Sequence, residues 1–312
     1  RYRVVDGIMR DDSWSFFLSL MVLLMAKLAK FYSIVRTFLN LGLKNLFRVV
    51  VYRFCKRAGI LSVLIGRSPA PNGPFFRKSE RQGAVPTGNS AWDESLWWFG
   101  FHTSKTSKGA PDWFSSHFDK NIALDPHEYW TDIDDFSQGD IKDVWELSRF
   151  DWVVAWSTQV ANGDSEKLEK MNAWVADWSM HNPPFLGPNW KCGQEASIRV
   201  LHCAVGLIVL GQDARPEQGM IDLVVSHLRR IEATLSYALA QQNNHGTSEA
   251  AALFIGGSLL ESYNENGSRW MALGRQVLEE RAGYLFEEDG SFSQYSVNYH
   301  RLALDTYSLV EA

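Results

Sequence analysis

From residue 141 to the end of the chain, apolar residues recur at intervals of three and four positions almost without interruption. This period is typical of helices that bury one face. It predicts seven helices, at residues 140–161, 165–181, 193–211, 217–241, 247–263, 268–286 and 295–311. Consecutive helices joined by short turns, with no alternating strands, predict an all-α fold.

The breaks between these segments have the residues that end helices. They are Ala161-Asn162-Gly163-Asp164, Asn182-Pro183-Pro184, Gly211, Gly246 and Asp289-Gly290, and glycine, proline and asparagine are the usual residues at such points. Helical pairs recur about every 50 residues, which fits both a closed toroid of helical hairpins and an open α-solenoid. Periodicity alone does not distinguish between the two.

Charge separates an N-terminal arm, residues 1–65, from the rest of the chain. No acidic residue occurs between Asp12 and Glu80, whereas this span has 11 lysines and arginines. The chain has 31 Lys and Arg in all, so 31 − 11 = 20 remain elsewhere against 36 Asp and Glu, a balance of 20 − 36 = −16. The sequence therefore predicts a basic, apolar arm on an acidic body.

Two parts of the arm differ in pattern. Residues 14–26 are almost wholly apolar, but a membrane span needs about 20 such residues. Asp11 and Asp12 stand where a signal peptide would have its basic region. In residues 39–60, basic residues alternate with apolar ones, as in an amphipathic helix. Membrane-surface contact through residues 14–60 and packing onto the body both remain open.

Residues 66–136 form the lead-in to the helical region. Their first part is rich in Gly, Pro, Ser and Asn, and the remainder mixes aromatic with turn residues. This composition predicts a linker or an extended segment. We expect the lead-in to pack on the body, residues 137–312, as one domain with it. Its aromatic side chains either line a sugar-stacking groove or pack loops onto the helices.

Two polar strings precede otherwise apolar helices near the C-terminus. They are Gln242-Asn243-Asn244-His245 and Ser296-Val297-Asn298-Tyr299-His300-Arg301. Proton abstraction beside a carboxylate, as in β-elimination on a uronic acid, needs an amide or a cation facing that carboxylate. It also needs groups that transfer protons. Asn244 is suited to the first task, and His245 and Tyr299 to the second.

Each of these residues also has a structural interpretation. Asn244 and His245 could cap a helix that starts near Thr247, since Asn is a favoured capping residue. Tyr299 and His300 could be interfacial side chains with buried rings and exposed polar ends. Arg301 could orient its neighbours or the substrate.

A third polar string lies at residues 190–199. Glu195 and Arg199 are four positions apart, the spacing of a surface ion pair on a helix. In a cleft, Arg199 could instead bind a uronate carboxylate through its planar guanidinium, and Gln194 could bind hydroxyls. Glu249, four positions after His245, either orients the imidazole or faces solvent.

The three strings together resemble the heparinase II/III-like polysaccharide lyases. The first motif that carries the resemblance is Asn243-Asn244-His245, followed by a helix that contains Glu249. The second is Asn298-Tyr299-His300-Arg301, preceded by Glu288-Asp289-Gly290-Ser291-Phe292, and the third is residues 190–199. It covers roughly residues 65–312. It implies an N-terminal α/α toroid followed by a β-sandwich domain, with the substrate cleft between them. Because the chain stops at Ala312, we expect an incomplete toroid without the β-sandwich.

The resemblance implies a polysaccharide lyase that cleaves uronate-containing glycans. The expected catalytic residues are Asn244, His245 and Tyr299, and the expected substrate-binding residues are Gln194, Glu195, Arg199, Asn243, Glu249, His300 and Arg301. We expect no cofactor or metal, an acidic polysaccharide as partner and no nucleic acid. The expected location is the periplasm or cell envelope, with the cytoplasm left open.

Two other functions remain open on the sequence. A carbohydrate-binding or polysaccharide-assembly protein would keep the toroid without turnover. A toroidal glycoside hydrolase would need two carboxylates flanking the scissile bond, and no such pair stands out among the acidic clusters at 128–135 and 287–289.

Overall fold

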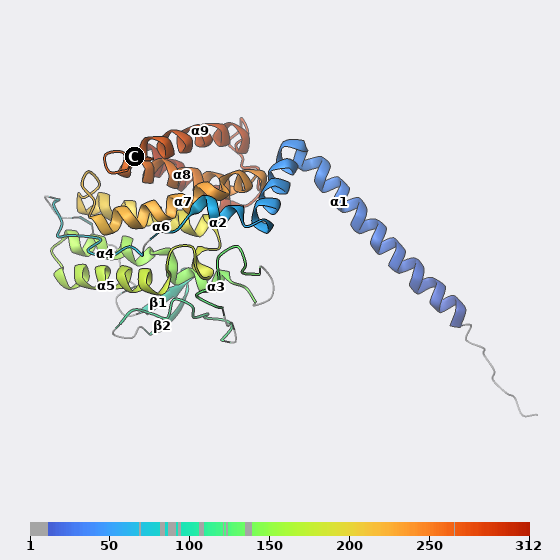
Figure 1. The fold of residues 1–312 in the computed structure, drawn as a ribbon, viewed down its shortest axis with the longest axis horizontal. Coiled ribbons are helices and arrows are strands. Elements are labelled where there is room, and N and C mark those ends of the chain that lie inside the picture. Colours follow the sequence, from blue (N-terminus) through green and yellow to red (C-terminus); the bar gives the residue numbers. More distant parts are fainter. Residues whose placement is uncertain are drawn as a thin grey trace, which may run out of the picture.

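The computed structural model describes residues 12–68, 70–81, 85–86, 92, 95–105, 109–120, 122, 124–134, 139–264 and 266–312. These residues are mostly helical, as predicted (Figure 1). The helices are α1 (Asp12–Arg57), α2 (Ile60–Ile65), α3 (Lys142–Trp145), α4 (Asp151–Ala161), α5 (Ser165–His181), α6 (Gly193–Leu210), α7 (Gln218–Ala240), α8 (Asn244–Leu260), α9 (Gly267–Leu285) and α10 (Val297–Glu311). Two 3₁₀ helices, η2 (Glu146–Arg149) and η3 (Pro188–Trp190), precede α4 and α6.

The predicted helices from 165 onward correspond to α5 to α10, and α5 has the predicted bounds. The predicted helix 140–161 is wrong in one respect, because α3, η2 and α4 divide it. The break is at Phe150, whose φ of 67° is in the left-handed region. Its ring is fully buried, with centroids 5.2 Å from Trp152 and 5.1 Å from Trp178. These core contacts hold a backbone conformation that a non-glycine residue rarely adopts.

The lead-in contains a hairpin that the sequence did not predict. Strands β1 (Ser95–Trp98) and β2 (His102–Lys105) pair in antiparallel register, with Ser95 opposite Lys105. Phe99 and Gly100, with φ of 54° and 76°, make the tight turn. Two positive φ angles are typical of a hairpin turn that matches strand twist.

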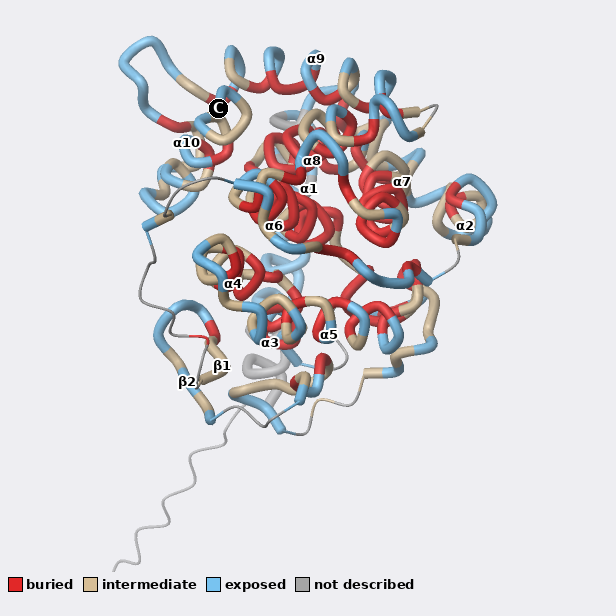
Figure 2. Tube along the Cα trace, turned by 90° about the vertical axis from the view of Figure 1, so that its left-hand side faces the viewer, coloured by how far each residue is buried: buried red, intermediate tan, exposed pale blue. Residues whose placement is uncertain are grey.

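Helices α4, α6, α8 and α10 contact one another in series, and α5 and α9 pack on α4 and α8. The buried residues concentrate along these contacts (Figure 2). Glycines bring α8 and α9 close together, since a Cβ on Gly257 would be 2.4 Å from the Met271 nitrogen. A Cβ on Gly274 would be equally close to the Phe254 nitrogen. This backbone-to-backbone packing accepts no side chain at either position.

Tryptophans form the centre of the core under α4 and α5. The ring of Trp152 is 5.3 Å from those of both Trp156 and Trp174, the latter in an edge-to-face arrangement. Trp113 extends this cluster from the lead-in, 5.9 Å from Trp174. Edge-to-face pairs at this separation add to the free energy of burial.

Two side-chain amides hold the lead-in to the helical body. Asn172 Oδ1 accepts hydrogen bonds from the backbone N–H groups of Phe75 (2.8 Å) and Phe76 (2.9 Å), and Asn172 Nδ2 donates to the Phe76 carbonyl. Gln212 bonds both backbone groups of Arg77 in the same way. The two phenylalanines are buried in the same core as the helices. Residues 75–77 of the lead-in are therefore fixed on the helical body.

Helix α1 consists of two different halves. Gly42, with φ 72° and ψ 157°, kinks α1. After the kink, α1 packs on α7, and the Tyr52 ring stacks on Tyr237 with centroids 4.0 Å apart. Before it, α1 extends away from the body (Figure 1). Packing onto the body, one of the two sequence interpretations of the arm, therefore applies to the second half only.

Candidate functional site

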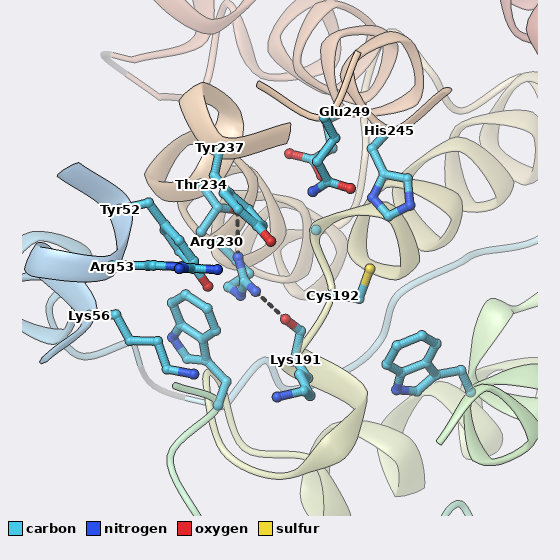
Figure 3. A pocket seen from close by; sticks show the side chains of 14 residues that line it. Tyr52, Arg53, Lys56, Lys191, Cys192, Arg230, Thr234, Tyr237, His245 and Glu249 are labelled. Atoms are coloured by element: carbon cyan, nitrogen blue, oxygen red, sulfur yellow. Dashed lines mark hydrogen bonds between the residues drawn. The ribbon is translucent and has the colours of Figure 1, made fainter. Parts of the chain in front are cut away.

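One pocket of about 320 Å³ lies where the second half of α1 meets the N-terminal ends of α6 and α8. Its described lining includes four cationic side chains, four aromatic rings and one carboxyl group (Figure 3). The lining residues are Tyr52, Arg53, Lys56, Trp130, Trp145, Lys191, Cys192, Gly193, Arg230, Thr234, Tyr237, Gln241, His245 and Glu249. The N-terminal ends of helices favour negative charge, so the backbone and the side chains attract anions together.

Arg230 is a rigid cation in the wall of this pocket. Its Nε donates to the Trp190 carbonyl (2.7 Å), Nη1 to Thr234 Oγ1 (2.8 Å) and Nη2 to the Lys191 carbonyl. Its guanidinium carbon lies 3.5 Å from the centroid of the Trp130 ring. Sequence analysis missed this residue, because an Arg229-Arg230 pair on an amphipathic helix has the pattern of a solvent-exposed face.

Glu249 is a buried carboxyl group facing the same space. Burial raises its pKa to about 8, although Arg230 acts in the opposite direction. Its Oε2 has no hydrogen-bond partner among the described residues. A Cβ on Gly193 would lie 2.6 Å from Glu249 Oε1, so the carboxyl group sits directly on the first turn of α6. One of the two sequence interpretations of Glu249, that its side chain faces solvent, is wrong, because the side chain is buried.

Replacing Gly193 with alanine is expected to destabilise the protein by about 1–3 kcal/mol, because the methyl group overlaps the buried carboxyl group. Gly283→Ala is the matched control, since Gly283 lies in α9 with open space around its Cβ position. That substitution is expected to stabilise by about 0.5–1 kcal/mol. Urea unfolding of the two variants measures the difference. Similar changes in both would contradict this placement of Glu249.

His245 also lines the pocket, from the first turn of α8. The predicted helix start near Thr247 is too late, because α8 begins at Asn244. Asn243 is the N-cap, and its Oδ1 accepts a hydrogen bond from the His245 N–H (3.0 Å). The cap predicted at Asn244 and His245 is therefore at Asn243. Burial lowers the pKa of the His245 imidazole, so the ring is neutral and able to accept a proton near pH 7.

The start of α8 is hydrogen-bonded to the segment that precedes α10. The backbone N–H of Asn244, a buried residue, donates to Gln294 Oε1 (2.9 Å), which lies just before α10. Neither Asn244 nor Tyr299 is among the described residues that line the pocket. Tyr299 is 45% exposed in the first turn of α10, where Ser296 Oγ accepts from its N–H.

The remaining residues of the α10 string lie away from the pocket. The His300 ring packs against Phe286 and Phe292, with centroids 5.7 and 5.8 Å away. Arg301 is exposed and its Nε lies 3.7 Å from Asp305. Neither is brought into contact with the described pocket lining.

The residues predicted on α6 form internal polar contacts. Glu195 accepts two hydrogen bonds from Arg149, at 2.8 and 3.0 Å, so the interpretation of Glu195 and Arg199 as a surface ion pair is wrong. Arg199 is fully buried and donates to His227 Nε2 and the Asn189 carbonyl. Gln194 Nε2 donates to Ser248 Oγ. None of these three predicted substrate ligands lines the described pocket.

Comparison with known proteins gives no match. No protein-family model matches the chain, and neither a curated protein nor a solved structure is significantly similar to it.

Proposed function

We propose that this protein is a polysaccharide lyase that cleaves uronate-containing glycans by β-elimination. The observation that carries the proposal is the pocket of Figure 3, where a neutral imidazole, the buried guanidinium of Arg230, three further cationic side chains and four aromatic rings face one space. The pocket has four cationic side chains, and its one described carboxyl group has a pKa of about 8. Such a site attracts carboxylates.

The helical arrangement supports part of an α/α toroid as the scaffold. Helices α4, α6, α8 and α10 contact one another in series, as an inner ring of helices would. Helix α5 packs on α4, α7 packs on α6 and α8, and α9 packs on α8. The first turns of α6 and α8 both reach the pocket, so the proposed active site is at one end of the inner ring.

In the proposed reaction, His245 removes the C5 proton of the uronate. The charge that develops on its carboxylate is stabilised by Arg230 and Lys191, which line the pocket, and by the amide of Asn244, which lies in the first turn of α8. Tyr299 protonates the leaving oxygen at C4, which conserves the proton count. The aromatic rings that line the pocket provide flat surfaces on which sugar rings can stack.

The test is the ultraviolet absorbance of the unsaturated uronate product, measured on a panel of uronate glycans. We expect Tyr299→Phe and His245→Ala each to lower the initial rate by about 10²–10⁴-fold. Tyr263→Phe is the matched control, because Tyr263 is also partly exposed but lies after α8, bonded to the Ala214 carbonyl. An unchanged rate in His245→Ala, or an equal loss in the control, would refute the assignment.

One observation favours a second function, carbohydrate binding without turnover. Tyr299 is half exposed and outside the described pocket lining, so the proton donor of the proposal is not in the pocket. Glycan binding by calorimetry that is abolished by Lys191→Gln, with no absorbance change on any glycan, would select this alternative. Hydrolysis has less support, because Glu249 is the sole carboxylate among the described lining residues and hydrolysis uses two.

A further inference from the structure

Residues 20–25 in the first half of α1 are apolar on every side of the helix. Residues 20–25 are six successive apolar residues, all more than half exposed. At about 100° per residue, six successive positions point all round a helix. Leu28 and Phe31 continue the exposed apolar surface toward the kink. A helix that is hydrophobic all round needs an apolar environment on all its sides, and the body does not supply one.

The second half of α1 presents a narrower apolar stripe. Leu43, Phe47 and Phe54 are 86%, 69% and 64% exposed, with Val50 and Val51 between them. At about 100° per residue these five positions fall within an arc of about 100°.

This stripe points away from the body. Asn45, which is buried, and Tyr52, which stacks on α7, occupy the opposite side of the helix. The half of α1 after Gly42 thus packs on the body with one side and exposes the apolar stripe on the other.

Basic residues adjoin both apolar surfaces. Lys27 and Lys30 follow residues 20–25. Lys44 lies on one edge of the stripe, with Arg48 beyond it and hydrogen-bonded to Asn45, and Arg57 lies near the other edge. No acidic residue occurs from residue 13 to residue 79. A partner protein with an ordinary mixed surface does not require that all charges around the contact be positive. An anionic lipid surface does, because each basic residue near it contributes about 1 kcal/mol of electrostatic attraction.

We propose that α1 anchors this protein to an anionic lipid bilayer. The half before Gly42 inserts its apolar surface among the acyl chains, and Lys27 and Lys30 extend to the phosphates. The half after Gly42 lies in the interface with its stripe toward the lipid. Among the described helices, α6 alone is long and apolar enough to cross a membrane, and it is 72% buried in the core.

The test is flotation of the whole chain with vesicles of phosphatidylcholine, alone or mixed with phosphatidylglycerol. We expect flotation with the mixed vesicles, and less of it in high salt. Leu24→Glu with Met25→Glu is expected to lower the bound fraction by more than about tenfold. Val297→Glu with Leu304→Glu is the matched control, because both residues are at least half exposed on α10. It is expected to float normally.

A separate pair of variants tests the charge. Lys44→Gln with Arg48→Gln is expected to weaken flotation with mixed vesicles, whereas Arg275→Gln with Arg301→Gln, on exposed positions of α9 and α10, is not. Circular dichroism of each variant confirms that the helices are retained. Equal flotation of the arm and control variants would overturn the proposal. So would an oligomer that dissociates in the arm variants while no lipid is bound.

Discussion

Arg230→Met is expected to lower the free energy of unfolding by about 3–5 kcal/mol, since buried polar partners then lose their donor. The carbonyls of Trp190 and Lys191 and the hydroxyl of Thr234 all accept hydrogen bonds from this guanidinium. Methionine fills a similar space beside Trp130 but donates nothing. Denaturant unfolding measures the change, and the midpoint is expected to fall with little change in slope.

Two further variants make this result specific. Arg275→Met removes an exposed arginine whose partner is Glu279, and is expected to change the free energy of unfolding by less than about 1 kcal/mol. Arg230→Lys keeps the charge but loses the fork that reaches three acceptors, and its stability is expected to lie between the other two. A loss in Arg230→Met no larger than in Arg275→Met would show that these contacts contribute little.

Glu249→Gln is expected to make the protein's stability less sensitive to pH. The carboxyl group has an ordinary pKa of 4.5, raised in the folded state to about 8. A raised pKa contributes stability that is present below the ordinary value and is lost as pH rises toward 8. From this group alone, the free energy of unfolding falls by about 1.4 kcal/mol per pH unit between about pH 5 and 8. Glutamine does not titrate, so the variant lacks this loss.

The measurement is denaturant unfolding of both proteins across that pH range. The stability of Glu249→Gln relative to the unaltered chain is expected to rise steadily with pH, whatever its value at pH 5. Glu279→Gln, on the exposed face of α9, removes the same charge and is expected to show no such rise. A constant difference between Glu249→Gln and the unaltered chain would mean that the carboxyl group ionises normally in the fold.

Local pattern was sufficient to predict the helices from α5 onward, because they bury one face, and α4, α5 and α6 end at an asparagine or a glycine. It failed where a distant contact decides the backbone. Phe150 has no sequence mark of a break, yet the rings of Trp152 and Trp178 hold it in the left-handed region. The hairpin β1–β2 was missed for a similar reason, since its turn contains Phe99 in place of a second glycine.

The candidate site was predicted only in part, for the same physical reason. His245 and Glu249 were found because they lie in one recognisable string, and both line the pocket. Arg230 and Tyr52 were missed because their roles depend on segments far away in the chain. Arg199 was wrongly included in the site. Its guanidinium was predicted to bind a carboxylate but is buried beside the Trp178 and Trp190 rings and His227.

The tryptophan cluster gives the protein a spectroscopic signal of its own. Trp113, Trp152, Trp156 and Trp174 are held in fixed mutual orientations in the body. Fixed aromatic packing produces near-ultraviolet circular dichroism, which disappears when tertiary packing is lost even if helices persist. Near- and far-ultraviolet spectra recorded on one sample therefore separate melting of the core from melting of α1, and no dye or label has to be attached.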